Sequence, residues 1–172
     1  FDVPHSRHNE ISREQLEAAG LTVLVESEAG GVHMAVSPDQ FRMIYFQGHP
    51  EYDINSLFKE YKREVSRYLA GALDAPPAFP ENYFPAAAAR LAREFLEKAQ
   101  RAGVSDSALP DFPDDELESM LDNTWGDTAK AVINNWLGLV YQLTNLDRNK
   151  QFMEEVDPVD PLGIKSGGRG SP

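Results

Sequence analysis

Residues 41–53 read Phe-Arg-Met-Ile-Tyr-Phe-Gln-Gly-His-Pro-Glu-Tyr-Asp. The nearly continuous apolar run Phe41–Phe46 predicts a strand at a buried position. The glycine after it permits a sharp turn, and Pro50 disfavours helical geometry at His49. Residues two apart in an extended chain point the same way, so the Glu51 carboxylate can lie beside the imidazole and fix its tautomer. Active sites of α/β folds lie at the ends of buried strands, so this turn is a candidate site.

Two shorter runs upstream predict further strands, Leu21–Glu26 and Val32–Val36, with a Gly-Gly turn between them. Connections this short require antiparallel neighbours, so we expect antiparallel strands over residues 21–47. Ser12 and Gln15 have the spacing of a capping box at the start of a short helix.

Helices are expected after the strands. Asp53 or Asn55 can cap the first, and its apolar stripe has helical spacing: Ile54, Leu57, Phe58, Tyr61, Val65 and Leu69. An inserted helix is predicted over about 86–102, and a short one capped by Asp114 runs through Leu121. Pro, Gly and Ser residues over 156–172 indicate a disordered tail after a domain portion spanning 1–155.

The last predicted helix, Trp125–Leu143, is apolar on more than one side. Such a helix is buried or lies in an interface, and it indicates a homodimer.

Composition excludes several classes of protein. The chain has 172 residues, a net charge of −12 and no cysteine. Nucleic acid and anionic membranes are poor partners for so acidic a surface, and no apolar run is long enough to span a bilayer. The lack of cysteine and of a signal-peptide pattern favours a cytoplasmic protein. His5 and His8 are three residues apart, but no carboxylate completes a site and no metal is expected.

The spacing of His49 and Glu51 alone fits an ordinary surface loop as well as a catalytic pair. The wider sequence, however, resembles the homoserine O-acyltransferases of methionine biosynthesis, in the class I glutamine amidotransferase-like superfamily. The similar segments occur in the family's order between residues 4 and 143: Pro4-His5-Ser6-Arg7, Leu24–Val32, Gly48–Asp53, Glu60–Arg63, Asn82-Tyr83-Phe84-Pro85, and Asn135-Trp136-Leu137 with Val140-Tyr141-Gln142. A series of this kind is far more specific than one short motif.

The resemblance implies an α/β fold, the C-terminal part of a flavodoxin-like, class I glutamine amidotransferase-like three-layer sandwich. It implies acyl transfer, succinyl or acetyl, from acyl-CoA as co-substrate to the hydroxyl of L-homoserine, with no bound cofactor. A cysteine carries the acyl group as a thioester. Because the chain has no cysteine, that residue is expected in an N-terminal half upstream of Phe1.

Four residues receive roles from the resemblance. His49 matches the general base, and Glu51 the carboxylate that orients it. Ser6 matches a residue that contacts substrate, and Arg63 one that grips the substrate carboxylate. From the sequence alone Ser6 could simply cap a turn, and Arg63 lies opposite the apolar stripe of its helix, where exposed arginines are common.

Departures from the family keep alternatives open. Trp125-Gly126-Asp127 replaces a Trp-Arg-x segment, and the 86–122 region is longer than expected. The acceptor could therefore be L-serine. A glutamine amidotransferase-like hydrolase and a non-catalytic interaction module of the same superfamily are further alternatives.

Overall fold

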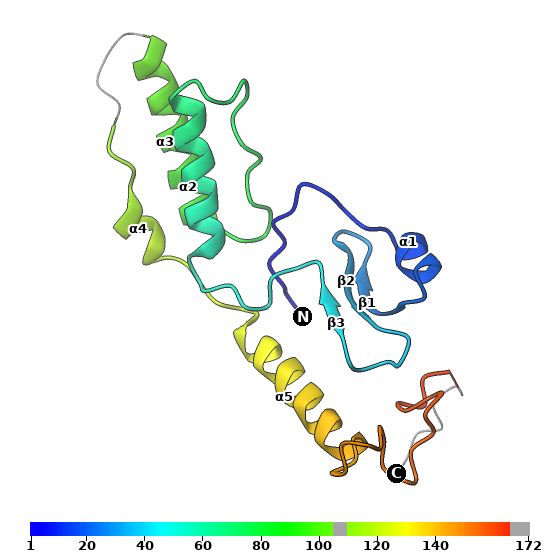
Figure 1. Cartoon of the computed structure of the whole chain (residues 1–172). Helices are drawn as coiled ribbons and strands as arrows, with labels where there is room; N and C mark the ends of the chain where they lie inside the picture. Colours follow the sequence, from blue (N-terminus) through cyan, green and yellow to red (C-terminus); the bar gives the residue numbers. More distant parts are fainter. Residues whose placement is uncertain (105–109, 166–172) are drawn as a thin grey trace. The chain divides into compact units, whose positions relative to one another are not determined.

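The computed structural model describes residues 1–104 and 110–165, and the chain divides into two compact units (Figure 1). One unit comprises Phe1–Pro50 with Trp125–Pro172, and the other comprises Glu51–Thr124. The first contains a three-stranded antiparallel sheet and the second is helical, which confirms an α/β chain with antiparallel strands. The flavodoxin-like three-layer arrangement and the domain limits stay predictions. Within the described ranges, no helix has both the length and the apolar character needed to cross a membrane.

The first unit begins with a short helix against a hairpin. Its elements are α1 (Arg13–Ala18), β1 (Thr22–Ser27), β2 (Gly31–Val36) and β3 (Ile44–Phe46), in the sheet order β1-β2-β3. The predicted capping box at Ser12 is confirmed, since its side chain accepts from the Gln15 amide and the Gln15 side chain accepts from the Ser12 amide. Leu16 of α1 packs against Val32 and Ala35. The helix thereby holds β2 in place. The first half of β2 lies next to the turn at Gly48, since the Gln47 amide donates to the His33 carbonyl over 2.9 Å.

The third strand corrects the sequence prediction. Only Ile44–Phe46 pair as a strand, and β3 lies at the edge of the sheet. Phe41 is buried but precedes the strand, because Gln40 takes a positive φ of 72° and turns the chain there. Met43 is 54% exposed. The prediction of a buried strand over Phe41–Phe46 is therefore wrong in extent and in burial.

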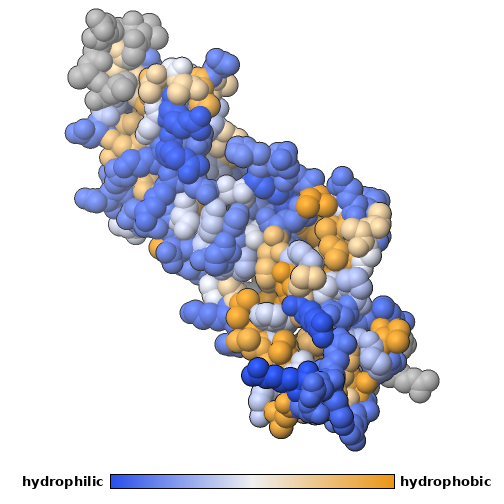
Figure 2. All heavy atoms as spheres, viewed as in Figure 1, coloured by the Kyte–Doolittle hydropathy of each residue, from blue (hydrophilic) through white to orange (hydrophobic). Residues whose placement is uncertain are grey.

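The last helix, α5 (Gly126–Leu143), belongs to the same unit. The Trp136 indole donates to the Phe41 carbonyl over 2.6 Å, so one side of α5 meets the loop before β3. No residue of α5 is buried, and apolar side chains lie exposed along it (Figure 2). Of the two alternatives predicted for this helix, burial does not occur among the described residues. A role in an interface stays a prediction.

The segment after α5 returns to this loop. The buried Gln40 side chain donates to the Asp160 carboxylate over 2.8 Å and accepts from the Leu162 amide over 3.0 Å. These two partners fall within the predicted disordered tail over 156–172. Residues 166–172 of that tail lie outside the described residues.

The second unit contains α2 (Ser56–Leu69), α3 (Ala86–Val104) and α4 (Asp114–Glu118). Its core joins the predicted α2 stripe to the apolar face of α3 and to α4, with these buried members: Phe58, Tyr61, Val65, Ala88, Ala92, Phe95, Ala99 and Leu117. Aromatic rings from the connecting segments cover this core, among them Phe79, Phe84 and Phe112. The predicted apolar stripe is thus confirmed over Phe58, Tyr61, Val65 and Leu69, whereas Ile54 precedes α2 and is exposed.

Two helix starts differ from the sequence prediction. Asn55 occupies the N-cap position of α2 but makes no side-chain capping bond. Instead the Tyr83 hydroxyl accepts from the Phe58 amide over 3.3 Å and donates to the Ile54 carbonyl over 2.5 Å. Asp114 does not cap α4, whose N-cap is Pro113; its carboxylate pairs with Lys62 instead. The two bonds from Tyr83 fix the start of the helix that carries Arg63.

Candidate active site

The turn Gly48-His49-Pro50 follows β3 after one residue, Gln47, and its histidine has contacts through both its backbone and its ring. The His49 amide donates to the Pro4 carbonyl over 2.7 Å. The His49 Nε2 lies 3.4 Å from the Ser6 carbonyl oxygen. Both contacts join the turn to the segment at residues 4–6, 43 residues or more away along the chain. The structure therefore brings together two of the predicted site residues, Ser6 and His49.

The contact uses the Ser6 carbonyl, and the Ser6 side chain itself is exposed. The partner of the His49 amide is a backbone atom of Pro4. Every residue has a backbone carbonyl, so the sequence does not indicate which one accepts a hydrogen bond. The contact between the His49 amide and the Pro4 carbonyl was therefore not predicted. The resemblance of Pro4-His5-Ser6-Arg7 to a family loop was the one signal that the segment belongs near the site.

Glu51 and Arg63 belong to the second unit. Glu51 is exposed at its first position, two residues after His49 in sequence. The Arg63 side chain is 63% exposed, and its Nε donates to the Glu64 carboxylate over 3.0 Å. It lies on α2 opposite the buried Phe58 and Val65, as the helical period predicts. An exposed guanidinium is chemically able to bind a carboxylate.

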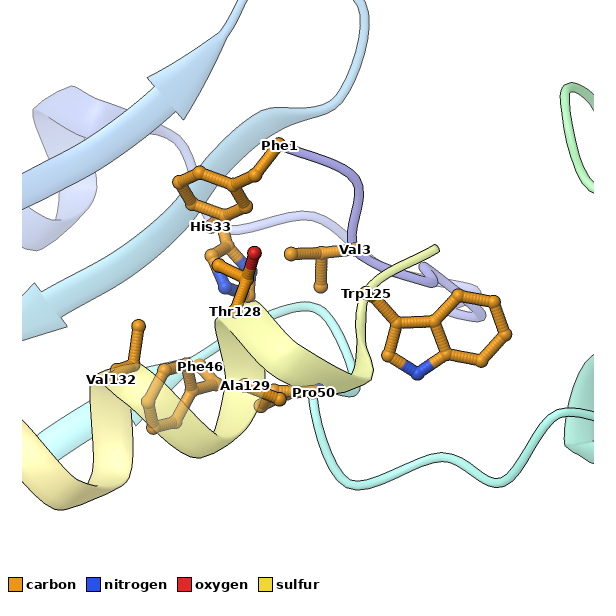
Figure 3. Close-up of a pocket in the computed structure, with 9 residues that line it drawn as sticks. All are labelled: Phe1, Val3, His33, Phe46, Pro50, Trp125, Thr128, Ala129 and Val132. Atoms are coloured by element: carbon orange, nitrogen blue, oxygen red, sulfur yellow. The ribbon is translucent and has the colours of Figure 1, made fainter. Parts of the chain in front are cut away.

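A small pocket with a volume of about 10 Å³, partly open to solvent, borders the histidine turn (Figure 3). Its walls come from the N-terminal segment, β2, β3, the turn and α5: Phe1, Val3, His33, Phe46, Pro50, Trp125, Thr128, Ala129 and Val132. Most of these side chains are apolar, and Pro50 connects the pocket to His49. A pocket of this volume has room for about one water molecule and not for a substrate.

His33 is a buried titratable group at this pocket. It is 8% exposed, and its Nδ1 has no hydrogen-bond partner. Burial, helped by the charge of His5, lowers the His33 pKa to about 4, so the ring is neutral near pH 7. Over residues 1–104 and 110–165, no group of three or more His, Cys, Asp or Glu residues could hold a metal ion.

Comparisons with known proteins agree on one family. The family model described as "HTS: Homoserine O-succinyltransferase" matches residues 1–146. The homoserine O-succinyltransferase of Methylococcus capsulatus is 58% identical over 167 residues, which cover 95% of this chain and 46% of that protein. The protein of the same description from Nitrosococcus oceani is 56% identical over 165 residues, covering 96% of this chain and 46% of that protein.

A further relative, the homoserine O-succinyltransferase of Thiothrix nivea, is 58% identical over 168 residues, again 46% of its length. The chain therefore spans about half the length of the curated relatives it matches. The matched residues include the histidine turn, the segment at residues 4–7 and α2.

Proposed function

We propose a function that follows from family membership: the chain belongs to the homoserine O-succinyltransferase family. The full-length protein transfers a succinyl group from succinyl-CoA to the hydroxyl of L-homoserine, a step in methionine biosynthesis. The nucleophile is a cysteine outside this chain, which contains none. The observation that carries the proposal is the match of residues 1–146, which includes the His49 turn.

His49 acts as the general base in two successive transfers. Its imidazole takes the proton from the cysteine thiol, the thiolate attacks the thioester carbonyl of succinyl-CoA, and the coenzyme A thiol leaves with that proton. The imidazole next takes the proton from the homoserine hydroxyl, whose oxygen attacks the acyl-cysteine. The cysteine thiolate leaves and regains the proton from the imidazolium. A backbone amide anchored 2.7 Å from the Pro4 carbonyl supports this role, because a general base must be held in place.

Glu51, Ser6 and Arg63 have supporting roles in this proposal. Glu51 orients the imidazole and stabilises its charged form, as a carboxylate does in triads of this kind. Arg63 binds the carboxylate of homoserine with its planar guanidinium, and its exposure on α2 leaves it accessible to a ligand. Ser6 contacts the substrate next to the base, in line with the closeness of its carbonyl to the His49 ring.

The test is an acyl-transfer assay on the full-length protein. Succinyl-CoA and acetyl-CoA are each paired with L-homoserine and with L-serine, and the products are identified by mass spectrometry. We expect O-succinylhomoserine as the main product. Its formation should fall about 10²- to 10⁴-fold in His49→Gln, the range usual for loss of a general base.

His8→Gln is the matched control, because His8 is an exposed histidine of the same unit. Its rate should equal that of the parent. Equal rates for His49→Gln and the parent would contradict the proposal. A preference for L-serine, or for the acetyl donor, would change the substrate assignment.

A further inference from the structure

Segment 4–7 contacts both the backbone and the ring of His49. It holds the backbone of the turn through the Pro4 carbonyl and approaches the ring through the Ser6 carbonyl. Pro4 is buried, so the first of these carbonyls sits on a fixed residue. A change in the conformation of this segment would therefore move the imidazole.

Arg7 fixes the conformation of the segment with a two-pronged contact. Its Nη1 lies 2.6 Å from the His5 Nδ1, and its Nη2 donates to the Gly30 carbonyl over 2.7 Å. The Glu10 carboxylate lies 3.4 Å from the same Nη2. Because Gly30 lies in the turn between β1 and β2, the guanidinium ties His5 to the rigid hairpin. An arginine only donates, so the His5 Nδ1 is the acceptor and the proton of the neutral ring is on Nε2.

The oriented His5 ring then packs against Gly48, the residue before His49. A Cβ atom at Gly48 would lie 2.7 Å from the His5 Nε2, 2.8 Å from the His33 Nδ1 and 2.8 Å from the Val3 Cγ1. Only a residue without a side chain fits at this distance. Burial and the charge of Arg7 lower the His5 pKa, which keeps the ring uncharged in this packing.

We propose that Arg7 and His5 are positioning residues, which hold the Gly48-His49 turn so that the His49 imidazole faces its reaction partners. The chain of contacts runs from the Gly30 carbonyl through the Arg7 guanidinium and the His5 ring to Gly48. The inference deepens the proposed function and rests on it, since the purpose of the positioning is general-base catalysis by His49. Neither residue needs to touch a substrate in this role.

The first test compares Arg7→Ala with Arg13→Ala in the full-length protein. Arg13 is a matched control because it also pairs with two side chains of the same unit, Glu17 and Glu26. We expect Arg7→Ala to lower kcat about 10- to 100-fold, the loss typical of a misplaced catalytic group. KM for succinyl-CoA should stay within about twofold, since binding contacts are kept. Arg13→Ala should keep the parent kcat.

Two further measurements separate positioning from a general loss of structure. Guanidinium ion at millimolar concentration should restore part of the kcat of Arg7→Ala and none of that of His49→Gln. His5→Asn keeps an acceptor near the place of Nδ1 and should retain more activity than His5→Leu, which has none. Absence of rescue together with equal rates for the two His5 variants would overturn the inference.

A readout without turnover distinguishes failure of the inference from failure of the proposed function. The full-length protein is labelled with ¹⁵N-histidine, and the His49 ring signals are assigned from their loss in His49→Gln. We expect these signals to shift in Arg7→Ala and to stay in place in Arg13→Ala. Unchanged His49 signals in both variants would overturn the inference, even if the parent is an active succinyltransferase. If the signals shift in Arg7→Ala but the parent does not transfer a succinyl group, the positioning role stands and the proposed reaction fails.

Discussion

The buried imidazole of His33 makes folding sensitive to acid. Its ring lies among Phe1, His5 and Phe46, with ring centroids 5.5 to 6.2 Å away, and its Nδ1 has no hydrogen-bond partner. Protonation would place a charge in this apolar setting next to a second histidine. The pKa of His5 is itself lowered by burial, by Arg7 and by His49, whereas Glu10 acts in the opposite direction.

The pH dependence of stability follows from the sign of the shift. The His33 pKa is about 4 in the folded protein against an ordinary 6.5. The unfolded chain therefore binds the proton first as pH falls, and stability is lost progressively between pH 6.5 and pH 4. The expected loss is on the order of 1–3 kcal/mol, at about 1.4 kcal/mol per pKa unit.

His33→Phe checks this prediction by urea unfolding of the full-length protein at a series of pH values. The phenyl ring keeps the aromatic packing and cannot be protonated, so the fall in unfolding free energy below pH 6.5 should be smaller than in the parent. His8→Gln, which changes an exposed ring, should follow the parent curve. Parallel curves for His33→Phe and the parent would show that His33 contributes nothing to the acid transition.

At the scale of elements, the start of α2 depends on a residue distant in sequence. The Tyr83 hydroxyl bonds both the Phe58 amide and the Ile54 carbonyl, and burial raises the Tyr83 pKa to about 12. The hydroxyl is therefore neutral and able to donate at any physiological pH. It replaces the side-chain cap that Asn55 does not provide.

Tyr83→Phe removes this cap and leaves the ring packing against Phe84 in place. We expect the second unit to lose about 1–2 kcal/mol, the usual effect of deleting an N-cap and a buried hydrogen bond. Native-state hydrogen exchange measures the change directly, and the Phe58 amide should exchange faster. Tyr141→Phe, which removes a hydroxyl from a side chain that is 79% exposed, is the control and should leave that exchange rate unaltered. Equal Phe58 exchange in Tyr83→Phe and the parent would contradict the prediction.

These two helix starts also show how far the sequence alone predicts the elements. The capping box at Ser12 is correct because all of its bonds lie within four consecutive residues. Asn55 is the N-cap residue as predicted, but the side-chain bond to the first turn comes from Tyr83, 25 residues beyond the Phe58 amide that it bonds. The cap expected from Asp114 is wrong, because its carboxylate pairs with Lys62, 52 residues away. The His49 turn follows the same rule. The extended geometry that Pro50 favours at His49 stays a prediction, whereas the contact with the Pro4 carbonyl carried no sequence signal.

At the scale of the whole molecule, apolar patterns in the sequence predict more burial than the chain provides. Met43 and Tyr45 around β3 are exposed, although that segment was predicted to be buried. Several residues of α5 are also exposed, and for that helix burial or an interface was predicted. Sequence periodicity reports that a face is apolar and does not identify what covers it. The chain spans about half the length of the curated relatives it matches.

The exposed side of α5 is the surface through which we expect the predicted homodimer to form. Ile133, Leu137 and Tyr141 are four residues apart and form one ridge, with exposed fractions of 40%, 53% and 79%. A ridge of this kind can pack against its own copy across a two-fold axis. We predict that the full-length protein is a dimer and that Leu137→Glu converts it to a folded monomer, because an unpaired charge at the centre of the ridge opposes association.

Light scattering coupled to size-exclusion chromatography measures the mass, and circular dichroism verifies folding. Gln142→Glu adds the same charge to α5 on a different side from the ridge and should remain dimeric. A dimeric Leu137→Glu would assign the subunit contact to another surface. An unfolded Leu137→Glu variant would also contradict the prediction. It would mean that the ridge is buried within a single full-length polypeptide, because a charge buried there prevents folding.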